Sequence, residues 1–417
     1  MSTVETPTPP TNALLASEQQ SSSPADLARG YLRRLASGDI GSLPIIIGMV
    51  IIAVIFQRAN SNFLTPRNFV NLITQMAGTT MIAYGVVFVL LLGEIDLSIG
   101  YVSAVCGVTV AMLLRDPTAG WQWYTAIPVG LLAVAGIGLL QGAIITLVRV
   151  PSFIVTLAGL LAWNGVVLHL IGSGGTVIIQ DKVVVGLANS YVPPDGLISW
   201  ILLAICLVLY AVLQFMRFNS RKARGLRPRP LLLIILELIV LAVAGIVVVA
   251  VCNQDRGVPV AGIILLVAVV LLTYLARSTP FGRYVYAVGG NAEAARRAGI
   301  NVARIRIIVF IMSSTLAGFG GIILASRLRS VDTNAGGGNL LLDAIASAVI
   351  GGTSLFGGRG FVASAVLGAL VISSVDNGLG LLNLSSGDKF IITGIVLLIA
   401  VIVDALSRRR QQQAGIA

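Results

Sequence analysis

The sequence is poor in charged residues. Only 11% of its 417 residues are Asp, Glu, Lys or Arg, whereas 56% are hydrophobic; soluble domains carry about 25% charged residues. The mean hydropathy is +0.95, and the apolar residues come in runs near the ~20 residues that cross a bilayer. These features argue against a soluble domain and predict an all-α, polytopic membrane protein.

Cysteine and histidine are also scarce. Cys106, Cys206 and Cys252 lie far apart and share no CxxC spacing, which argues against a zinc site or a disulfide framework. The single histidine, His169, lies in an apolar run and makes neither a metal site nor a catalytic triad by itself. We therefore expect no metal ligands and no catalytic residues, and a membrane-embedded enzyme is disfavoured.

A phosphate-binding GxxxxGK[ST] loop is missing as well. The nearest stretch, GTSLFGGRG at 352–360, has arginine where that loop needs lysine. Uphill transport then needs either an ion gradient, which usually involves polar or acidic residues near the membrane midplane, or ATP hydrolysed by a partner. We expect no cofactor in this chain; ATP and Mg would be bound by a partner ATPase docked on the cytoplasmic face.

What is present is a series of apolar runs along the whole chain. They predict about twelve transmembrane helices, near 42–57, 70–92, 98–114, 125–148, 152–171, 197–216, 231–251, 260–276, 305–325, 341–356, 361–380 and 389–406. The membrane domain is thus expected over 42–406. Residues 1–25, rich in Ser, Thr, Pro and Gln, predict a disordered tail, and 407–417 form a second tail. Residues 26–41 suit an interfacial helix or a solvated linker.

Basic residues set the expected orientation. Twelve spans place both termini on one side, and that side collects most of the 28 Lys and Arg residues, including the loop FMRFNSRKARGLRPRP and Arg408–Arg410. The other side holds eight: Arg58, Arg67, Arg115, Lys182, Arg256, Arg327, Arg329 and Lys389. The positive-inside rule therefore predicts cytoplasmic termini. The longest external loop, 172–196, is too small for a binding domain, so any substrate-capturing domain must be a separate protein.

The connection 278–304 carries the clearest local signal. Asn291 is a good N-cap, Ala292 to Ala298 are strong helix formers and Gly299 is a natural stop, which predicts a helix of about two turns. Acidic Glu293 near its start and basic residues near its end suit the helix dipole. Such a helix between two spans could transmit motion from a partner; the alternative is a turn that only anchors the topology.

A second signal is GEIDLSIG at 93–100, which follows the apolar run VVFVLLL. Span parity places Glu94 and Asp96 at the cytoplasmic end of the second span, where they reach water, headgroups or backbone donors. Gly93 and Gly100 are expected to bracket a helix break, and Asp96 to cap the next helix. A gating role for this stretch stays open beside the structural one.

GEIDLSIG, FGRYVYAVGGNAEAARRAGI and DAIASAVIGGTSLFGGRG, in this order, resemble the permease subunits of ribose/xylose-type ATP-binding-cassette importers. The resemblance covers about 42–406. It implies a type II importer-like permease fold, a homodimer, an ATPase with two nucleotide-binding cassettes and an external sugar-binding protein. It also implies that a coupling helix enters a groove of the ATPase here, formed by Gly290, Asn291, Glu293, Ala294, Ala295, Arg296, Arg297, Gly299 and Ile300.

Residues 217–260 add a basic cytoplasmic loop and an extra apolar segment relative to ribose-type members. This insertion looks like that of the family's xylose permeases, so D-xylose or a related pentose is the expected substrate. The runner-up function is a self-sufficient ion-coupled transporter of a small polar solute, which would take up solute without an ATPase.

Two further sets of residues are candidates. The spacing of Gly93, Leu97 and Gly100 recurs at Gly351, Leu355 and Gly358, as duplicated halves or chance would produce. Four glycines in and around this second stretch suit helix packing, a hinge or a pore lining: Gly351, Gly352, Gly357 and Gly358. Polar groups within spans are candidate sugar contacts, although each could simply join helices: Asn71, Gln75, Trp163, Asn164, Asn339 and Asn377.

Overall fold

The computed structural model describes residues 43–116, 120–194, 197–226 and 230–395, together with Leu398 and Ile402. The predicted tails at 1–25 and 407–417 and the interfacial helix at 26–41 lie outside the described residues. Apart from its first two residues, the part of the chain described below belongs to one unit, Ile45–Val401.

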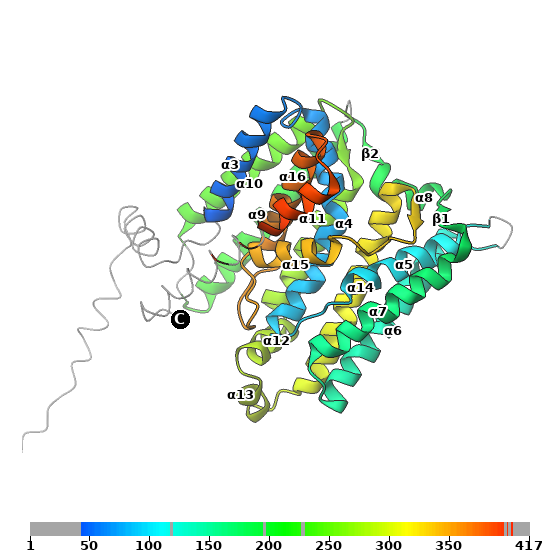
Figure 1. The fold of residues 1–417 in the computed structure, drawn as a ribbon. Coiled ribbons are helices and arrows are strands. Elements are labelled where there is room, and N and C mark those ends of the chain that lie inside the picture. The colour runs from blue at the N-terminus through cyan, green and yellow to red at the C-terminus, as the bar shows by residue number, and fades with distance from the viewer. Residues whose placement is uncertain are drawn as a thin grey trace, which may run out of the picture. The chain divides into compact units, whose positions relative to one another are not determined.

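Long apolar helices dominate this unit (Figure 1). Eight are long and apolar enough to cross a membrane: α4 (Pro66–Leu91), α6 (Trp123–Ala143) with its π-helical continuation η2 (Ile144–Val148), α7 (Ser152–Ile171) with the 3₁₀ turn η3 (Gly172–Gly174), α9 (Leu197–Ala223), α10 (Leu231–Cys252), α11 (Val260–Ser278), α14 (Val302–Leu328) and α16 (Ser364–Leu381). Three apolar helices are shorter: α3 (Leu43–Ala59), α5 (Ile99–Leu113) and α15 (Leu340–Ile350). Each predicted span from 42–57 to 361–380 overlaps one of them, and residues 386–395 begin a further helix.

The predicted span at 341–356 is wrong in length. Helix α15 has 11 residues, about 16 Å at 1.5 Å per residue, roughly half of the ~30 Å hydrocarbon core. It ends at Gly351, after which Gly352 has φ of +91°, and residues 351–363 form turns and loop up to the start of α16. Helix α15 therefore reaches only part of the way through a bilayer.

Two small β-ribbons accompany the helices. Strand β1 (Thr176–Ile178) pairs antiparallel with β4 (Ser330–Asp332), and β2 (Tyr191–Val192) pairs antiparallel with β3 (Val258–Pro259). Between β1 and β2 lies α8 (Lys182–Asn189), which Asp181 caps by accepting from two backbone N–H groups. The described part of the predicted loop, 172–194, is thus folded and lies at the C-terminal end of α14, where the Ser326 hydroxyl accepts from the Ala188 N–H and donates to the Val185 carbonyl.

Helix α14 is the centre of the unit and packs against α4, α5 and α6. Its glycines let other backbones approach closely: a Cβ on Gly321 would lie 1.8 Å from the Ser103 carbonyl oxygen of α5. Large side chains such as Tyr84, Phe88 and Phe310 fill the space around these contacts and are fully buried. Small residues at helix contacts are the usual means of close packing in membranes, where the hydrophobic effect does not drive helices together.

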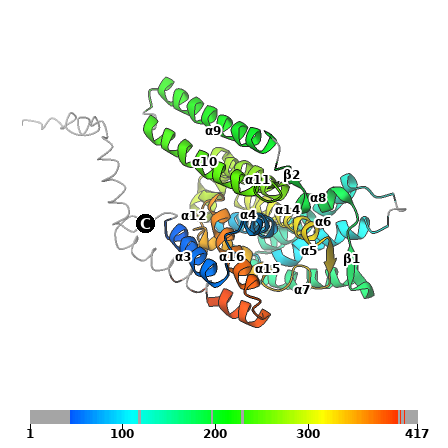
Figure 2. The ribbon, with the colours of Figure 1, turned by 90° about the horizontal axis from the view of Figure 1, so that it is seen from above.

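Helices α9 and α10 form an antiparallel pair at one edge (Figure 2). In each helix only 6% of an apolar 18-residue stretch is buried within the unit. Most of the apolar surface of the pair is therefore accessible to lipid. The Tyr210 hydroxyl bonds Glu237 at 3.1 Å, which gives the acid of α10 a polar partner. Helix α9 continues to Ala223, so the predicted basic loop is helical in its first half.

Candidate functional site

The connection between α11 and α14 folds into two helices rather than a loop. Helix α12 (Pro280–Gly290) starts behind Thr279, whose hydroxyl accepts from the Gly282 N–H at 3.3 Å. Helix α13 (Ala292–Arg297) follows, and Asn291 caps it by accepting from the Ala294 N–H at 2.9 Å. Gly299, with φ of +83°, ends it. The helix predicted from the cap and stop signals is confirmed.

Helix α13 presents charged side chains outward. Glu293 pairs with Arg296 at 2.9 Å and with Arg297 at 3.5 Å, and all three side chains are more than half exposed. Ala295, on the inner side, is 5% exposed. Exposed ion pairs contribute little stability, typically about 0–1 kcal/mol, so these charges are not needed to hold the fold. They make α13 a charged, solvated projection between two long helices.

Helix α12 ends at a meeting point of three backbones, which we call the glycine junction: Gly93, Gly289, Gly357 and Gly358. The Gly358 N–H donates to the Leu91 carbonyl of α4 at 2.9 Å. A Cβ on Gly289 would lie 1.7 Å from that same carbonyl oxygen, and one on Gly357 would lie 2.9 Å from the Gly93 nitrogen. The break after α4, the loop after α15 and the end of α12 are therefore in direct backbone contact.

One of the two tyrosines of α12 connects this helix to the same loop, because the Tyr286 hydroxyl donates to the Gly360 carbonyl at 2.8 Å. The other predicted hinge glycines lie elsewhere. A Cβ on Gly100 would be 2.7 Å from the Gly336 carbonyl oxygen, and one on Gly351 would be 2.6 Å from that of Ser364, so both permit close packing. Gly352 has φ of +91° and open space around it. Gly100 lies inside the first turn of α5, so only Gly93 is within the break.

The two acids of GEIDLSIG have different surroundings. Glu94 forms an ion pair with Arg306 of α14 at 3.0 Å, with its side chain 13% exposed. Asp96 is 4% exposed and reaches a backbone donor rather than water, one of the alternatives that the sequence left open. Its Oδ1 accepts from the Ser98 N–H at 2.9 Å and the Ser98 hydroxyl at 2.7 Å. Gln141 of α6 in turn donates to the Ser98 hydroxyl at 2.9 Å, so Asp96 fixes the start of α5.

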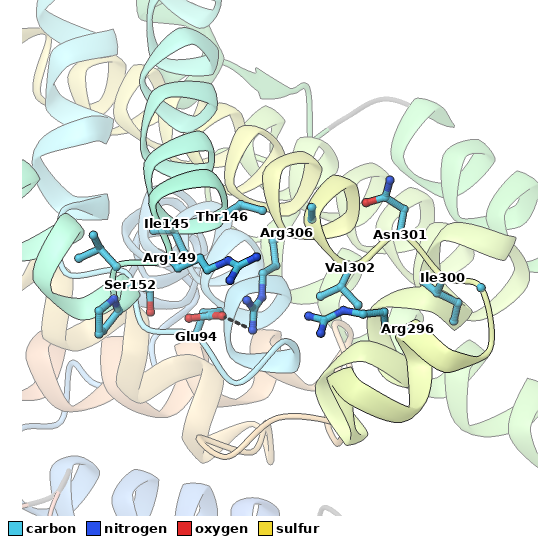
Figure 3. Close-up of a pocket in the computed structure, with 14 residues that line it drawn as sticks. Glu94, Ile145, Thr146, Arg149, Ser152, Arg296, Ile300, Asn301, Val302 and Arg306 are labelled. Atoms are coloured by element: carbon cyan, nitrogen blue, oxygen red, sulfur yellow. Dashed lines mark ion pairs between the residues drawn. The ribbon is translucent and has the colours of Figure 1, made fainter.

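A cleft of about 890 Å³ opens beside α13. Figure 3 shows Glu94, Arg149, Arg296 and Arg306 around it, with the Arg306 guanidinium directed at Glu94. The cleft joins four segments: the α4–α5 break, the turn between η2 and α7, α13, and the start of α14. Three arginines and one glutamate give it a net positive charge. A protein surface with acidic side chains would complement this positive charge.

The predicted pathway residues do not form one site. Gln75 and Asn377 belong to a closed amide cluster with Asn68, in which Asn377 bonds Asn68 at 2.7 and 3.1 Å and Gln75 at 3.1 Å. Asn71 instead accepts from Arg256, which stacks on Tyr191. These contacts join helices and a β-ribbon, which is the alternative that the sequence left open.

The remaining pathway candidates are divided between two places. Trp163 and Asn164 are on α7, which packs on α5 and α6. Asn339 is the N-cap residue of α15 but makes no side-chain capping bond. Together with Asp343 it lines a small cavity against the helix at 386–395. Sequence reasoning missed Asp343 and Asp376, although an acid inside an apolar run is a recognisable signal. It also missed Arg306, whose pairing with Glu94 depends on tertiary structure.

Among the described residues, no group of three or more His, Cys, Asp or Glu could hold a metal ion.

Comparison with known proteins gives a consistent result. Residues 68–401 match the family model described as "Branched-chain amino acid transport system / permease component". The chain is 36% identical over 353 residues to the xylose transport system permease protein of Escherichia coli K12, covering 84% of this chain and 87% of that protein.

Two further relatives extend this result. The xylose transport system permease protein of Haemophilus influenzae is 34% identical over 382 residues, covering 90% of this chain and 99% of that protein. The ribose import permease protein of Bacillus subtilis is 33% identical over 358 residues, covering 86% and 91%. No solved structure matches the chain significantly.

Proposed function

The chain belongs to this family of transport permeases, and on that premise we propose that it moves D-xylose or another pentose across a bacterial plasma membrane. It is a non-catalytic, multi-pass membrane subunit of a binding-protein-dependent ABC sugar importer of the xylose/ribose type. The family implies an ATPase and an external binding protein as partners. We further propose a homodimer with about twelve spans per chain, cytoplasmic termini, and ATP and Mg bound by an ATPase subunit with two cassettes.

The observation that carries the proposal is the attachment of α13 to the glycine junction. Helix α13 follows α12 directly, and Gly289 of α12 touches both the end of α4 and the loop after α15. A displacement of α13 would therefore act directly on the breaks after α4 and after α15, because no long loop separates α13 from the glycine junction. The positive cleft next to α13 offers acidic groups of the ATPase a place to bind. This geometry suits coupling of ATP hydrolysis in a partner to rearrangement of the spans.

Xylose is favoured over ribose because the similarity to xylose permeases is higher. The basic connection and α10 also lie in the insertion, residues 217–260, that looks like that of the xylose permeases. The family model's description names branched-chain amino acids instead. Uptake of radiolabelled D-xylose, D-ribose and L-leucine should be compared in proteoliposomes that hold the permease with its ATPase and binding protein. We expect ATP-dependent uptake, fastest for D-xylose and absent for L-leucine.

The ion-coupled alternative is tested with the permease alone. Proteoliposomes lacking the ATPase should show no D-xylose accumulation when a proton or sodium gradient is imposed. Accumulation under those conditions would refute the proposal. Within the complete transporter, Glu293→Lys combined with Arg297→Glu should abolish most ATP-dependent uptake while insertion remains normal, because the double change reverses the charges presented to the ATPase and keeps one acid and one base four residues apart.

A further inference from the structure

The turn between η2 and α7 combines two uncommon backbone features. Residues Ile144–Val148 form a π-helix, and Arg149, which ends it, has φ of +62° and ψ of +35°. Single π-helical turns occur frequently at functional sites. The left-handed conformation disfavours residues with a Cβ, and glycine is the usual residue at such a helix end. Local backbone geometry therefore does not account for an arginine at this position.

Arg149 differs from the other two arginines of the cleft beside α13. Arg306 pairs with Glu94 at 3.0 Å, and Arg296 pairs with Glu293 at 2.9 Å. The side chain of Arg149 is exposed, lines the cleft and forms neither an ion pair nor a hydrogen bond with any residue that the structure describes. An acid that enters the cleft can therefore pair with Arg149 without breaking an existing ion pair.

The cleft separates Arg149 from α13. Figure 3 shows Arg149 on one side of Arg306 and Arg296 of α13 on the other. The volume of the cleft, about 890 Å³, lies in the upper part of the ~300–1,000 Å³ range of ligand pockets, so it has room for several side chains. A protein groove that encloses α13 has a wall on this side, and that wall enters the cleft and faces Arg149.

The lining around Arg149 is largely apolar. Ile145, Val150 and Pro151 lie on its side of the cleft, and Ile300 and Val302 line the part next to α13 and the start of α14. Charges that are partly shielded from water attract each other more strongly than charges in bulk water. The lining therefore fits a protein surface on which an acidic side chain is flanked by apolar ones.

A lipid headgroup is the competing ligand. Leu147 and Val148, directly before Arg149, are 73% and 67% exposed and belong to a helix long and apolar enough to cross a membrane, so the turn lies at the membrane surface. Basic pockets in such places bind anionic lipids. The cleft favours a protein ligand because it is shared with α13, whose side chains Glu293 and Arg296 are more than half exposed.

We propose that Arg149 forms a second contact with the ATPase by binding an acidic side chain of the ATPase wall that enters the cleft beside α13. This contact connects α6 and α7 with the ATPase, in addition to α12 and α14 on either side of α13. A movement of the ATPase then acts on both groups of helices together. The inference rests on the proposed function, since it presumes that the chain has an ATPase partner.

The first test compares two glycine variants. Arg329, at the C-terminal end of α14, is also exposed and left-handed, with φ of +56°. Arg149→Gly and Arg329→Gly both place glycine where its backbone is favoured, so both variants should fold. With the purified ATPase and the permease in nanodiscs, we expect Arg149→Gly to raise the Kd about tenfold, the scale of a hydrogen bond to a charged group. Arg329→Gly should leave the Kd unchanged.

The second test identifies what occupies the cleft. A benzophenone maleimide is attached to Arg149→Cys in a chain that also carries Cys206→Ser; the other two native cysteines are buried. After illumination of the complete transporter, we expect a crosslink from this position to the ATPase. The same reagent on Arg329→Cys should give no crosslink to the ATPase.

Equal Kd values for the two glycine variants, or a crosslink from Arg149→Cys to phospholipid alone, would overturn the second contact. If the wild-type permease bound no ATPase, the proposed function would fail together with it. If the wild-type permease bound the ATPase and Arg149→Gly bound it equally well, the second contact alone would fail.

Discussion

At the scale of single residues, Gly289 and Gly290 are neighbours with opposite surroundings. A Cβ on Gly289 would lie 1.7 Å from the Leu91 carbonyl oxygen, whereas one on Gly290 would meet nothing within 4 Å. Gly289→Ala should therefore force backbones apart and lower the free energy of unfolding by at least ~1–3 kcal/mol. Gly290→Ala should change it by less than about 0.5 kcal/mol.

Both variants can be compared by thermal unfolding in detergent, in a Cys206→Ser background. Cys106 and Cys252 are buried, so a thiol-reactive dye reports the unfolding midpoint. Equal midpoints for the two alanine variants would show that the glycine junction is not tightly packed. A lower midpoint for Gly289→Ala together with reduced ATP-dependent uptake would connect the junction with transport.

The Glu94–Arg306 pair offers a second residue-scale prediction. Both side chains are largely buried, at 13% and 30% exposed, so the pair should be worth somewhat more than an average surface pair, about 1 kcal/mol. A double-mutant cycle of Glu94→Gln and Arg306→Gln, followed by unfolding in an SDS titration, should give a coupling free energy of that size. Additive effects would mean that the contact contributes nothing. The cycle of Glu293→Gln and Arg296→Gln, on exposed side chains, is the control and should be near zero.

At the scale of elements, α13 is short enough to depend on its cap. Its six residues are stabilised at the start by the bond from the Ala294 N–H to Asn291. Asn291→Ala should cost about 1 kcal/mol and so speed hydrogen exchange of the α13 amides about fivefold. Asn291→Asp keeps an acceptor at the cap and should exchange like the wild type. Exchange rates unaffected by Asn291→Ala would contradict the role of this cap.

Helix α13 could be predicted from sequence because its signals are local. The cap, the alanines and the terminal glycine lie within nine residues, and each acts on its own turn. Helix α15 could not, since the run 341–356 is apolar beyond the point where the helix ends. There Gly351 packs on the Ser364 carbonyl, a contact from the next element. Composition indicates that a run prefers lipid or a core, but not where tertiary packing stops its helix.

The candidate site shows the same division. The glycines of GEIDLSIG and of the 351–358 stretch could be singled out by their spacing, yet only the fold brings Gly93, Gly289 and Gly358 together. Likewise, an intramembrane asparagine is recognisable in sequence, but its partner is not. The Asn377 amide donates to Gln75, which lies 302 residues away in the chain.

At the scale of the whole chain, the length of α14 can be compared with the thickness of the membrane. Its 27 residues span about 40 Å, more than the ~30 Å hydrocarbon core. Helix α13 immediately precedes its first turn, and α8 is bonded to Ser326 near its last turn. A membrane crossed by α14 must therefore have α8 on one side and α13 on the other. In the orientation that we propose from the excess of basic residues, the side of α13 faces the cytoplasm.

This orientation predicts opposite labelling of two exposed positions. In chains whose native cysteines are replaced by serine, Lys182→Cys at the start of α8 should react with a membrane-impermeant maleimide in intact spheroplasts. Glu293→Cys on α13 should react only in inverted vesicles. The two sites control for each other, since both side chains are exposed and differ in the face they occupy. Labelling of both from one face would refute the opposition of α8 and α13, and a reversed pattern would place the charged α13 outside, where no ATPase could reach it.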